Sequence, residues 1–173
     1  METKIISELT TENLHLVAES LRRGEVVAIP TETVYGLGAN GLDEASMDKI
    51  YAAKGRPSDN PLILHVPNAD SIKPLVKEIP DTAYKLIDAF WPGPLTITLP
   101  KSDLVPDRAT GGLDRVALRC PDHDICREVL SLAGVPIAAP SANISGRPSP
   151  TTAQAVYDDM NGRIPYIVDA GIC

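Results

Sequence analysis

The chain has 173 residues, of which 43% are hydrophobic and 23% are charged, as in an ordinary globular protein with a sizeable core. Its net charge of −7 argues against a protein whose whole surface binds nucleic acid, but it leaves room for a local basic site. No apolar run approaches the ~20 residues that a membrane helix needs. Cys120, Cys126 and Cys173 form no CxxC pair, which indicates reduced thiols and a cytoplasmic protein.

Five stretches with apolar residues at helical spacing predict helices. The first covers residues 9–23, where Thr10 or Thr11 can act as the N-cap. The second begins after Asp43 and carries Lys54 in its last turn, before a stop at Gly55. The remaining three are predicted over residues 81–90, 125–133 and from 151 or 152 to 160.

Between these helices, short apolar runs predict strands that are buried on both faces. The first, at residues 26–29, ends at Pro30, and a glycine-rich turn with Gly36 and Gly38 follows it. The other predicted strands cover residues 62–66, 95–99, 116–119, 135–139 and 166–168. Because helices and strands are interspersed throughout, we expect one α/β domain, with ligands bound beyond the carboxyl ends of its strands.

Two cations, Lys54 and Arg56, stand at the start of a loop that prolines stiffen over residues 57–61. A guanidinium fork and an ammonium can converge on one anion, such as a phosphate. Such a pair, taken alone, is more often two solvated surface charges, which contribute little. It therefore predicts an anion site only if other polar groups lie opposite it.

Small polar residues follow the predicted strand at 135–139. Ser141, Asn143 and Ser145 can direct hydroxyl, amide and backbone N–H groups toward phosphate oxygens, or they can form a plain capping turn. No GxxxxGK[ST] motif is present, and the glycine-rich turn lacks the third glycine of a dinucleotide fingerprint. A nucleotide that binds here must use a different cradle.

His65 lies in the predicted strand at residues 62–66. It is either a satisfied core residue or a hydrogen-bonding group for a substrate carboxylate or hydroxyl. Metal binding is not favoured, because His15 and His123 lie far away in the sequence without any ligand spacing.

Several longer motifs resemble the YrdC-like family, the threonylcarbamoyl-AMP synthases. The most specific are PTETVYGLG at residues 30–38, KGRPSDNPLILH at 54–65 and PSANISG at 140–146. WPGPLT at 91–96 and VALRCP around Arg119 add support, and the match runs from the first helix to the end of the chain. Several motifs in the right order are far more specific than any one of them.

The resemblance implies a fold, which is one domain over residues 1–173 with a twisted, mixed β-sheet flanked by helices and an open, basic concave face for ligands. It also implies a reaction, in which L-threonine, bicarbonate and ATP give threonylcarbamoyl-AMP and pyrophosphate. Mg²⁺ would arrive bound to ATP, with no prosthetic group and no metal held by protein side chains. The product serves threonylcarbamoylation of certain tRNAs, which implies a downstream transferase and contact with tRNA.

The family's residue roles fall largely on the positions singled out above. The resemblance implies that L-threonine is held by Thr33, His65, Arg119 and the backbone at Ala139. It implies that the catalytic polar quartet consists of Lys54, Arg56, Ser141 and Asn143, and that ATP is contacted by Arg56, Asn60, Ser141 and Ser149. Adenylation needs the carbamate oxygen in line with the α-phosphorus, and it needs cations to hold the charge that develops. Lys54 and Arg56 suit the second of these tasks.

The family's minimal members continue into a Ser-Thr-Val strand and a nucleotide-contacting arginine, and longer members append a second domain. We therefore expect this chain, which stops at Cys173, to lack the family's last strand and any C-terminal domain.

Two alternative functions stay open. One is an RNA-binding module without chemistry, disfavoured by the negative charge and few aromatics. The other is a relative that handles carbamoyl-phosphate-type intermediates.

Overall fold

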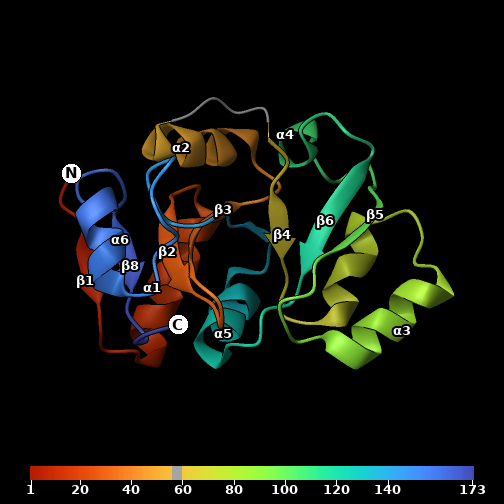
Figure 1. Cartoon of the computed structure of the whole chain (residues 1–173), viewed down its shortest axis with the longest axis horizontal. Coiled ribbons are helices and arrows are strands. Elements are labelled where there is room, and N and C mark those ends of the chain that lie inside the picture. Colours follow the sequence, from red (N-terminus) through yellow and green to blue (C-terminus); the bar gives the residue numbers. More distant parts are fainter. Residues whose placement is uncertain (56–59) are drawn as a thin grey trace.

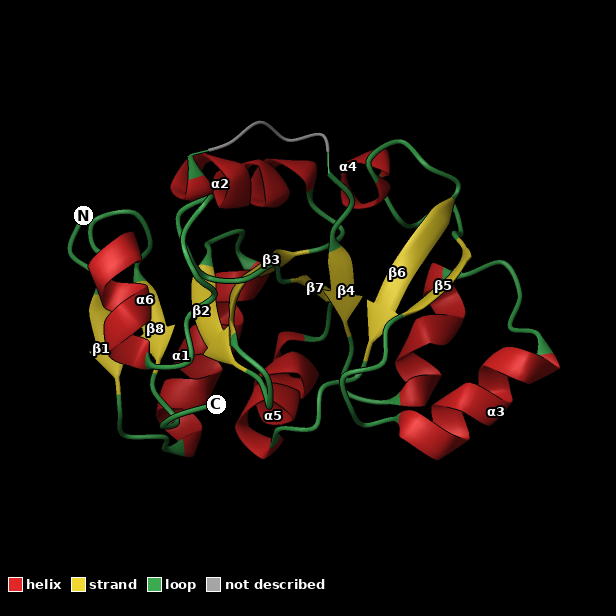
Figure 2. Cartoon of the chain, in the orientation of Figure 1, coloured by secondary structure: helices red, strands yellow, loops and turns green. Residues whose placement is uncertain are grey.

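The computed structural model describes residues 1–55 and 60–173, which form one sheet with helices around it (Figure 1 and Figure 2). The strands in these residues are β1 (Lys4–Ile6), β2 (Val27–Pro30), β3 (Tyr35–Asn40), β4 (Ile63–His65), β5 (Ile97–Pro100), β6 (Arg115–Arg119), β7 (Ile137–Ala138) and β8 (Tyr166–Val168). The helices are α1 (Thr11–Arg22), α2 (Glu44–Lys54), the 3₁₀ helix η1 (Ala69–Leu75), α3 (Asp81–Phe90), α4 (Asp107–Thr110), α5 (Asp124–Ala133) and α6 (Ala153–Met160). The predicted α/β class with a mixed sheet is confirmed.

The sheet runs in the order β1-β8-β2-β3-β7-β4-β6-β5. β1, β8 and β2 are parallel, β4 and β6 form a second parallel pair, and the other neighbours are antiparallel. β3 joins the two parts, since its first residues pair with β2 and its last two pair with β7. In Figure 1 the arrowheads of β2, β4 and β6 point to the same side, where the segments after Pro30, His65 and Arg119 begin.

β2 is buried on both faces, as its continuous apolar run predicts. Ala28 packs into the apolar cluster that holds residues of α2, α3 and α6. Val27 and Ile29 point to the opposite face, into the cluster formed with α1 and α5. The strand therefore carries its following turn, residues 31–34, on a rigid support between two cores.

Local capping signals place the ends of α1 and α2. Thr10, one of the two candidates, caps α1 by accepting a hydrogen bond from the backbone N–H of Asn13 at 3.2 Å. Asp43 caps α2 by accepting from the backbone N–H of Ala45 at 3.2 Å. Gly55, at φ 69°, closes α2 in the left-handed conformation. Lys54 accordingly lies in the last turn of α2, as predicted.

The glycine-rich stretch after residue 34 is a strand, β3, and the predicted turn there is wrong. Neither Gly36 nor Gly38 has a positive φ. Their role is to allow close packing against the segment that contains β7. A Cβ at Gly38 would lie 3.0 Å from Cγ2 of Ile137, and one at Gly36 would lie 3.2 Å from Cβ of Ala139.

Three short elements, β1, η1 and α4, were not predicted because three to seven residues carry too little periodicity. β1 is held by its parallel pairing with β8, which only the folded chain supplies. The predicted stiff loop at 57–61 and Arg56 fall on or beside residues 56–59, which lie outside the described residues. Within the described ranges, no helix is long and apolar enough to cross a membrane.

Candidate active site

The turn that follows β2 is built by Thr31, a buried residue that the sequence analysis did not single out. Its hydroxyl oxygen accepts hydrogen bonds from the backbone N–H groups of Thr33 and Val34, both at 3.2 Å. The hydroxyl also lies 2.6 Å from the carbonyl oxygen of Val34, to which it donates. Threonine side chains commonly fix turns in this way. The turn thereby fixes the backbone from which the Glu32 and Thr33 side chains extend.

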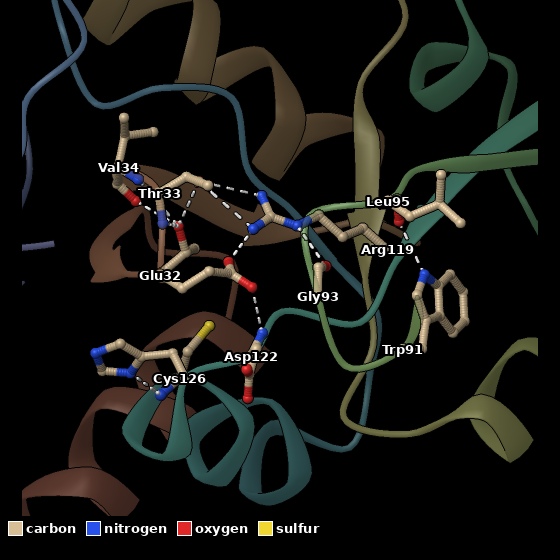
Figure 3. A network of polar contacts seen from close by, with 11 residues as sticks. Glu32, Thr33, Val34, Trp91, Gly93, Leu95, Arg119, Asp122 and Cys126 are labelled. Carbon is tan, nitrogen blue, oxygen red and sulfur yellow. Dashed lines mark hydrogen bonds and ion pairs between the residues drawn. The ribbon is translucent and has the colours of Figure 1, made fainter. Parts of the chain in front are cut away.

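Arg119, at the end of β6, faces this turn (Figure 3). Its Nε donates to the carbonyl oxygen of Gly93 at 3.2 Å. Its Nη1 and Nη2 make long contacts of 3.5 and 3.4 Å with the hydroxyl oxygen of Thr33. Nη2 also forms an ion pair with the carboxylate of Glu32. The predicted proximity of Thr33 and Arg119 is therefore present in the structure.

His65 is the neighbour of Arg119 in the sheet, because the parallel register of β4 and β6 pairs these two residues. The ring is 2% exposed, and its Nδ1 lies 3.0 Å from the carbonyl oxygen of Ile63, which requires Nδ1 to donate. Burial lowers the pKa of His65 to about 4, and the charge of Arg119 adds to this, while backbone hydrogen bonds to Ile63 and Ile137 oppose it. His65 is thus a buried, neutral imidazole beside the guanidinium.

The depressed pKa of His65 predicts a specific acid sensitivity. Between pH 6.5 and about 4, the unfolded chain binds a proton at His65 that the folded protein does not. The free energy of unfolding therefore falls as the pH falls through this window, and the loss reaches about 3 kcal/mol at pH 4. Above pH 6.5 His65 is neutral in both states and costs no stability. Urea unfolding at pH 4 to 8 should show a weaker pH dependence for His65→Gln than for the wild type.

A replacement of the exposed His15 on α1, His15→Gln, provides the control for this measurement. It should leave the pH dependence of the wild type intact. Identical pH dependence in the wild type and in His65→Gln would show that His65 is not the group responsible.

Lys54 is 4% exposed, so its ammonium is inside the protein. Its Nζ donates to the carbonyl oxygens of Ser141 at 2.5 Å and Asn143 at 3.0 Å. These bonds join the C-terminal turn of α2 to the segment after β7, although the residues lie 87 and 89 positions apart in the sequence. Lys54, Ser141 and Asn143, predicted as members of one polar quartet, are thus in direct contact.

The segment 141–145 presents polar groups that the other described residues leave unused. Within the described residues, the backbone N–H groups of Ser141 and Asn143 make no hydrogen bond. The side-chain oxygens of Asn143 and Ser145 are buried and also have no partner among these residues. Backbone N–H groups close to a buried lysine form a concavity suited to anionic oxygens. The predicted phosphate contact therefore has a chemically suitable place.

Asp159 on α6 holds this segment from the other side. Its carboxylate accepts from the backbone N–H of Ile144 at 2.9 Å and forms an ion pair with Arg147 at 2.7 Å. Desolvation raises the pKa of Asp159, but the hydrogen bonds from Ile144 and Arg147 outweigh it and hold that pKa below its ordinary value. No sequence motif pointed to Asp159, because its partners become neighbours only in the folded chain.

The remaining predicted residues have different surroundings. Ala139 is buried, and its backbone N–H donates to the carbonyl oxygen of Ile63 at 3.3 Å, beside β4. Asn60 and Ser149 are exposed, and within the described residues their side chains make no hydrogen bond. The carbonyl oxygen of Asn60 accepts a hydrogen bond of 2.6 Å from the hydroxyl of Tyr51. Arg56 lies outside the described residues.

The three cysteines are free, and Cys120 and Cys126 are buried. Burial raises the pKa of Cys126 to about 12, which keeps the thiol protonated and unreactive. Burial also raises the pKa of Cys173, and a hydrogen bond with the backbone of Thr31, in the turn after β2, opposes this rise. Among the described residues, no group of three or more His, Cys, Asp or Glu side chains could hold a metal ion.

A hollow of about 450 Å³ lies elsewhere, between the segment around η1 and the end of α5. Its described lining includes Val66, Leu75, Leu104 and Leu130 and no charged side chain. None of the predicted site residues lines it. Recognition of a charged amino acid or a triphosphate needs charged and hydrogen-bonding groups, so the clusters around Arg119 and Lys54 are the better candidate.

Comparison with known proteins places this arrangement in a family. The family model for Sua5, YciO and YrdC, described as "Telomere recombination", matches residues 19–173. The chain belongs to the Sua5/YciO/YrdC family. The resemblance drawn from the sequence motifs is therefore confirmed, and the two clusters described above lie within the part of the chain that the Sua5/YciO/YrdC model covers.

Curated relatives in the Sua5/YciO/YrdC family include the threonylcarbamoyl-AMP synthase of Pyrococcus abyssi. It is 54% identical over 158 residues, which cover 91% of this chain and 46% of that protein. The threonylcarbamoyl-AMP synthase of Bacillus subtilis is 50% identical over 170 residues, which cover 96% of this chain and 49% of that protein. The chain thus spans about half the length of the curated relatives it matches.

Solved structures agree with this assignment. P. abyssi Sua5 complexed with L-threonine superposes with a TM-score of 0.95 at 51% identity, covering 98% of this chain and 51% of that one. E. coli YciO superposes with a TM-score of 0.86 at 20% identity and covers 98% and 85%, which supports the fold alone. The mixed sheet with its surrounding helices is therefore the Sua5/YciO/YrdC fold.

Proposed function

We propose that the chain carries a threonylcarbamoyl-AMP synthase site, in which L-threonine, bicarbonate and ATP give threonylcarbamoyl-AMP, pyrophosphate and water. The observation that carries the proposal is the pair of polar clusters at strand ends. One centres on Arg119 with Thr33 and His65, and the other on Lys54 with Ser141 and Asn143. The relatives named threonylcarbamoyl-AMP synthase, at 54 and 50% identity, support the same reaction.

The Arg119 cluster suits the amino acid. A guanidinium offers paired N–H donors to a carboxylate, and the hydroxyl of Thr33 lies beside two of its nitrogens. His65 is neutral, so it adds no second positive charge that would repel the amino group of the substrate. In this proposal the backbone at Ala139 borders the amino acid from the β7 side.

The Lys54 cluster suits the triphosphate. The ammonium of Lys54 holds the 141–143 segment, while the backbone N–H groups of Ser141 and Asn143, which no other described residue binds, would face anionic oxygens. The amino group of L-threonine would form a carbamate with bicarbonate, and a carbamate oxygen would then displace pyrophosphate from the α-phosphorus of ATP. The protein's contribution is to align these groups and balance the developing charge.

Arg56, Asn60 and Ser149 complete the proposed ATP contacts, and Mg²⁺ would enter as part of the ATP complex. The supply of threonylcarbamoyl groups to tRNA through a downstream transferase, and a contact with tRNA itself, belong to the same proposal. The cytoplasm is the compartment in which these substrates meet.

The proposal is tested by incubating the 173-residue chain with ATP, Mg²⁺ and bicarbonate, with and without L-threonine. Pyrophosphate release should depend on L-threonine, and mass spectrometry should detect threonylcarbamoyl-AMP. A second sample joins the chain to the remaining half of the B. subtilis relative, since that half is absent from the match. Pyrophosphate release without L-threonine, or no threonylcarbamoyl-AMP from either sample, would contradict the proposal.

A further inference from the structure

Glu32 has no role in the function proposed above, yet it joins two parts of the amino acid site (Figure 3). One carboxylate oxygen pairs with Nη2 of Arg119, 87 positions away in the sequence. The other oxygen accepts a hydrogen bond of 2.6 Å from the backbone N–H of Asp122. The carboxylate thus links the turn after β2 to both β6 and the segment that enters α5.

The ion pair is held away from bulk water, because the side chains of Arg119 and Glu32 are 11% and 22% exposed. Hydrogen bonds between charged groups are stronger than neutral ones, and partial burial weakens their screening. Glu32 and the carbonyl oxygen of Gly93 hold the guanidinium through Nη2 and Nε. Among the described residues, Nη1 has only its long contact with the hydroxyl of Thr33. The hydroxyl of Thr33 also lies 3.1 Å from the hydroxyl of Thr31, so the long contact with Nη1 joins the guanidinium to the fixed turn.

Two roles for Glu32 have opposite consequences. A carboxylate that merely fills the place of a substrate carboxylate would compete with the substrate for Arg119, and its removal would tighten binding. Two observations oppose this role. Glu32 is anchored a second time at the backbone of Asp122, and its turn is fixed by the hydrogen bonds of Thr31. A carboxylate that is anchored twice on a fixed turn is suited to orienting the guanidinium, and it is not suited to moving aside for a substrate carboxylate.

We propose that Glu32 is a positioning residue of the L-threonine site. It holds the Arg119 guanidinium and the segment at Asp122 so that Nη1 and the Thr33 hydroxyl face the amino acid. This inference rests on the function proposed above, and it adds a residue that acts on threonine affinity through Arg119.

The test compares the wild type with Glu32→Gln, which keeps the shape and one acceptor oxygen but removes the charge. The Kd of L-threonine is measured by calorimetry, and kcat and both KM values are measured by threonine-dependent pyrophosphate release. The Kd and the KM for L-threonine should rise ~10-fold or more, because a charge-assisted bond becomes a neutral one. The KM for ATP and kcat should stay within ~3-fold, since only the binding of L-threonine loses an interaction. Glu32→Asp keeps the charge and should show a smaller rise.

Glu19→Gln on α1 is the matched control, because Glu19 pairs with Arg22 at 3.1 Å where both side chains are about half exposed. It should leave all four constants unchanged. Unchanged or tighter L-threonine binding by Glu32→Gln overturns the positioning role, and so does an equal loss of affinity for ATP. If the wild type binds no L-threonine, the proposed function is overturned as well. If the wild type is fully active and Glu32→Gln has the same constants, only the inference about Glu32 is overturned.

Discussion

Replacing Arg119 by alanine is expected to lower kcat/KM for L-threonine by ~100-fold or more, because hydrogen bonds to a charged group contribute about 1.5–3 kcal/mol. The change removes the guanidinium that faces Thr33 and leaves the carboxylate of Glu32 without its charged partner. It also removes the bond to the carbonyl oxygen of Gly93. The loss should be largest in the KM for L-threonine, measured by pyrophosphate release, with little change in the KM for ATP.

Arg115→Ala provides the matched control on the same strand. Arg115 is exposed and donates to the carbonyl oxygen of Thr98 at 2.8 Å, away from the cluster around Arg119. Its removal should leave kcat/KM within ~2-fold, as is usual for an isolated surface charge. Arg119→Lys separates charge from geometry, because an ammonium lacks the planar fork, and it should recover only part of the loss. Similar losses in Arg115→Ala and Arg119→Ala would contradict the assignment of Arg119 to the amino acid.

Replacing Lys54 by methionine is expected to reduce both stability and activity. Methionine fills much of the buried space but leaves the carbonyl oxygens of Ser141 and Asn143 without their donor. Buried acceptors that lose a partner cost about 1–3 kcal/mol each, so the loss of two should lower the free energy of unfolding by about 2–6 kcal/mol. The 141–145 segment would lose its fixed position, and threonine-dependent pyrophosphate release should fall ~100-fold with loss of this alignment. Urea unfolding and steady-state kinetics measure the two effects.

Lys49→Met on the same helix is the control. The side chain of Lys49 is 51% exposed, and its Nζ donates to the carbonyl oxygen of Gly24 at 2.9 Å. Its loss should cost less than about 1 kcal/mol and should leave activity intact. If Lys49→Met and Lys54→Met lower stability and activity equally, the bonds of Lys54 do not hold the segment after β7.

The sequence alone predicts those features of the fold that depend on near neighbours. Residues 81–90 form α3 with the predicted bounds, and Asp43 and Gly55 begin and end α2 as their capping preferences indicate. β3 is the instructive failure, because Gly36 and Gly38 are also typical of a turn. The stretch is a strand because residues 35–38 pair with β2, and the glycines are accommodated by the close approach of Ile137 and Ala139, about a hundred positions later in the sequence.

The candidate site divides in the same way. Its residue types and motifs, including Lys54, Ser141 and Arg119, are visible in the sequence and sufficed to predict the family. Glu32, Thr31 and Asp159 were not singled out as functional, because a carboxylate or a hydroxyl acquires its role only from the partner it meets. Glu32 meets Arg119, and Lys54 meets Ser141, each across 87 positions of the chain.

The sequence by itself therefore determined the α/β class, the buried strand β2, the ends of α2 and α3 and the chemical groups available to the proposed threonine and ATP site. Hydrophobic periodicity and capping act over a few residues, so they can be recognised without the fold. The tertiary structure alone decided that His65 is neutral beside Arg119, that Lys54 binds the segment after β7, and that Glu32 links two strand ends. Burial and distance set these properties, and both arise only when the sheet assembles.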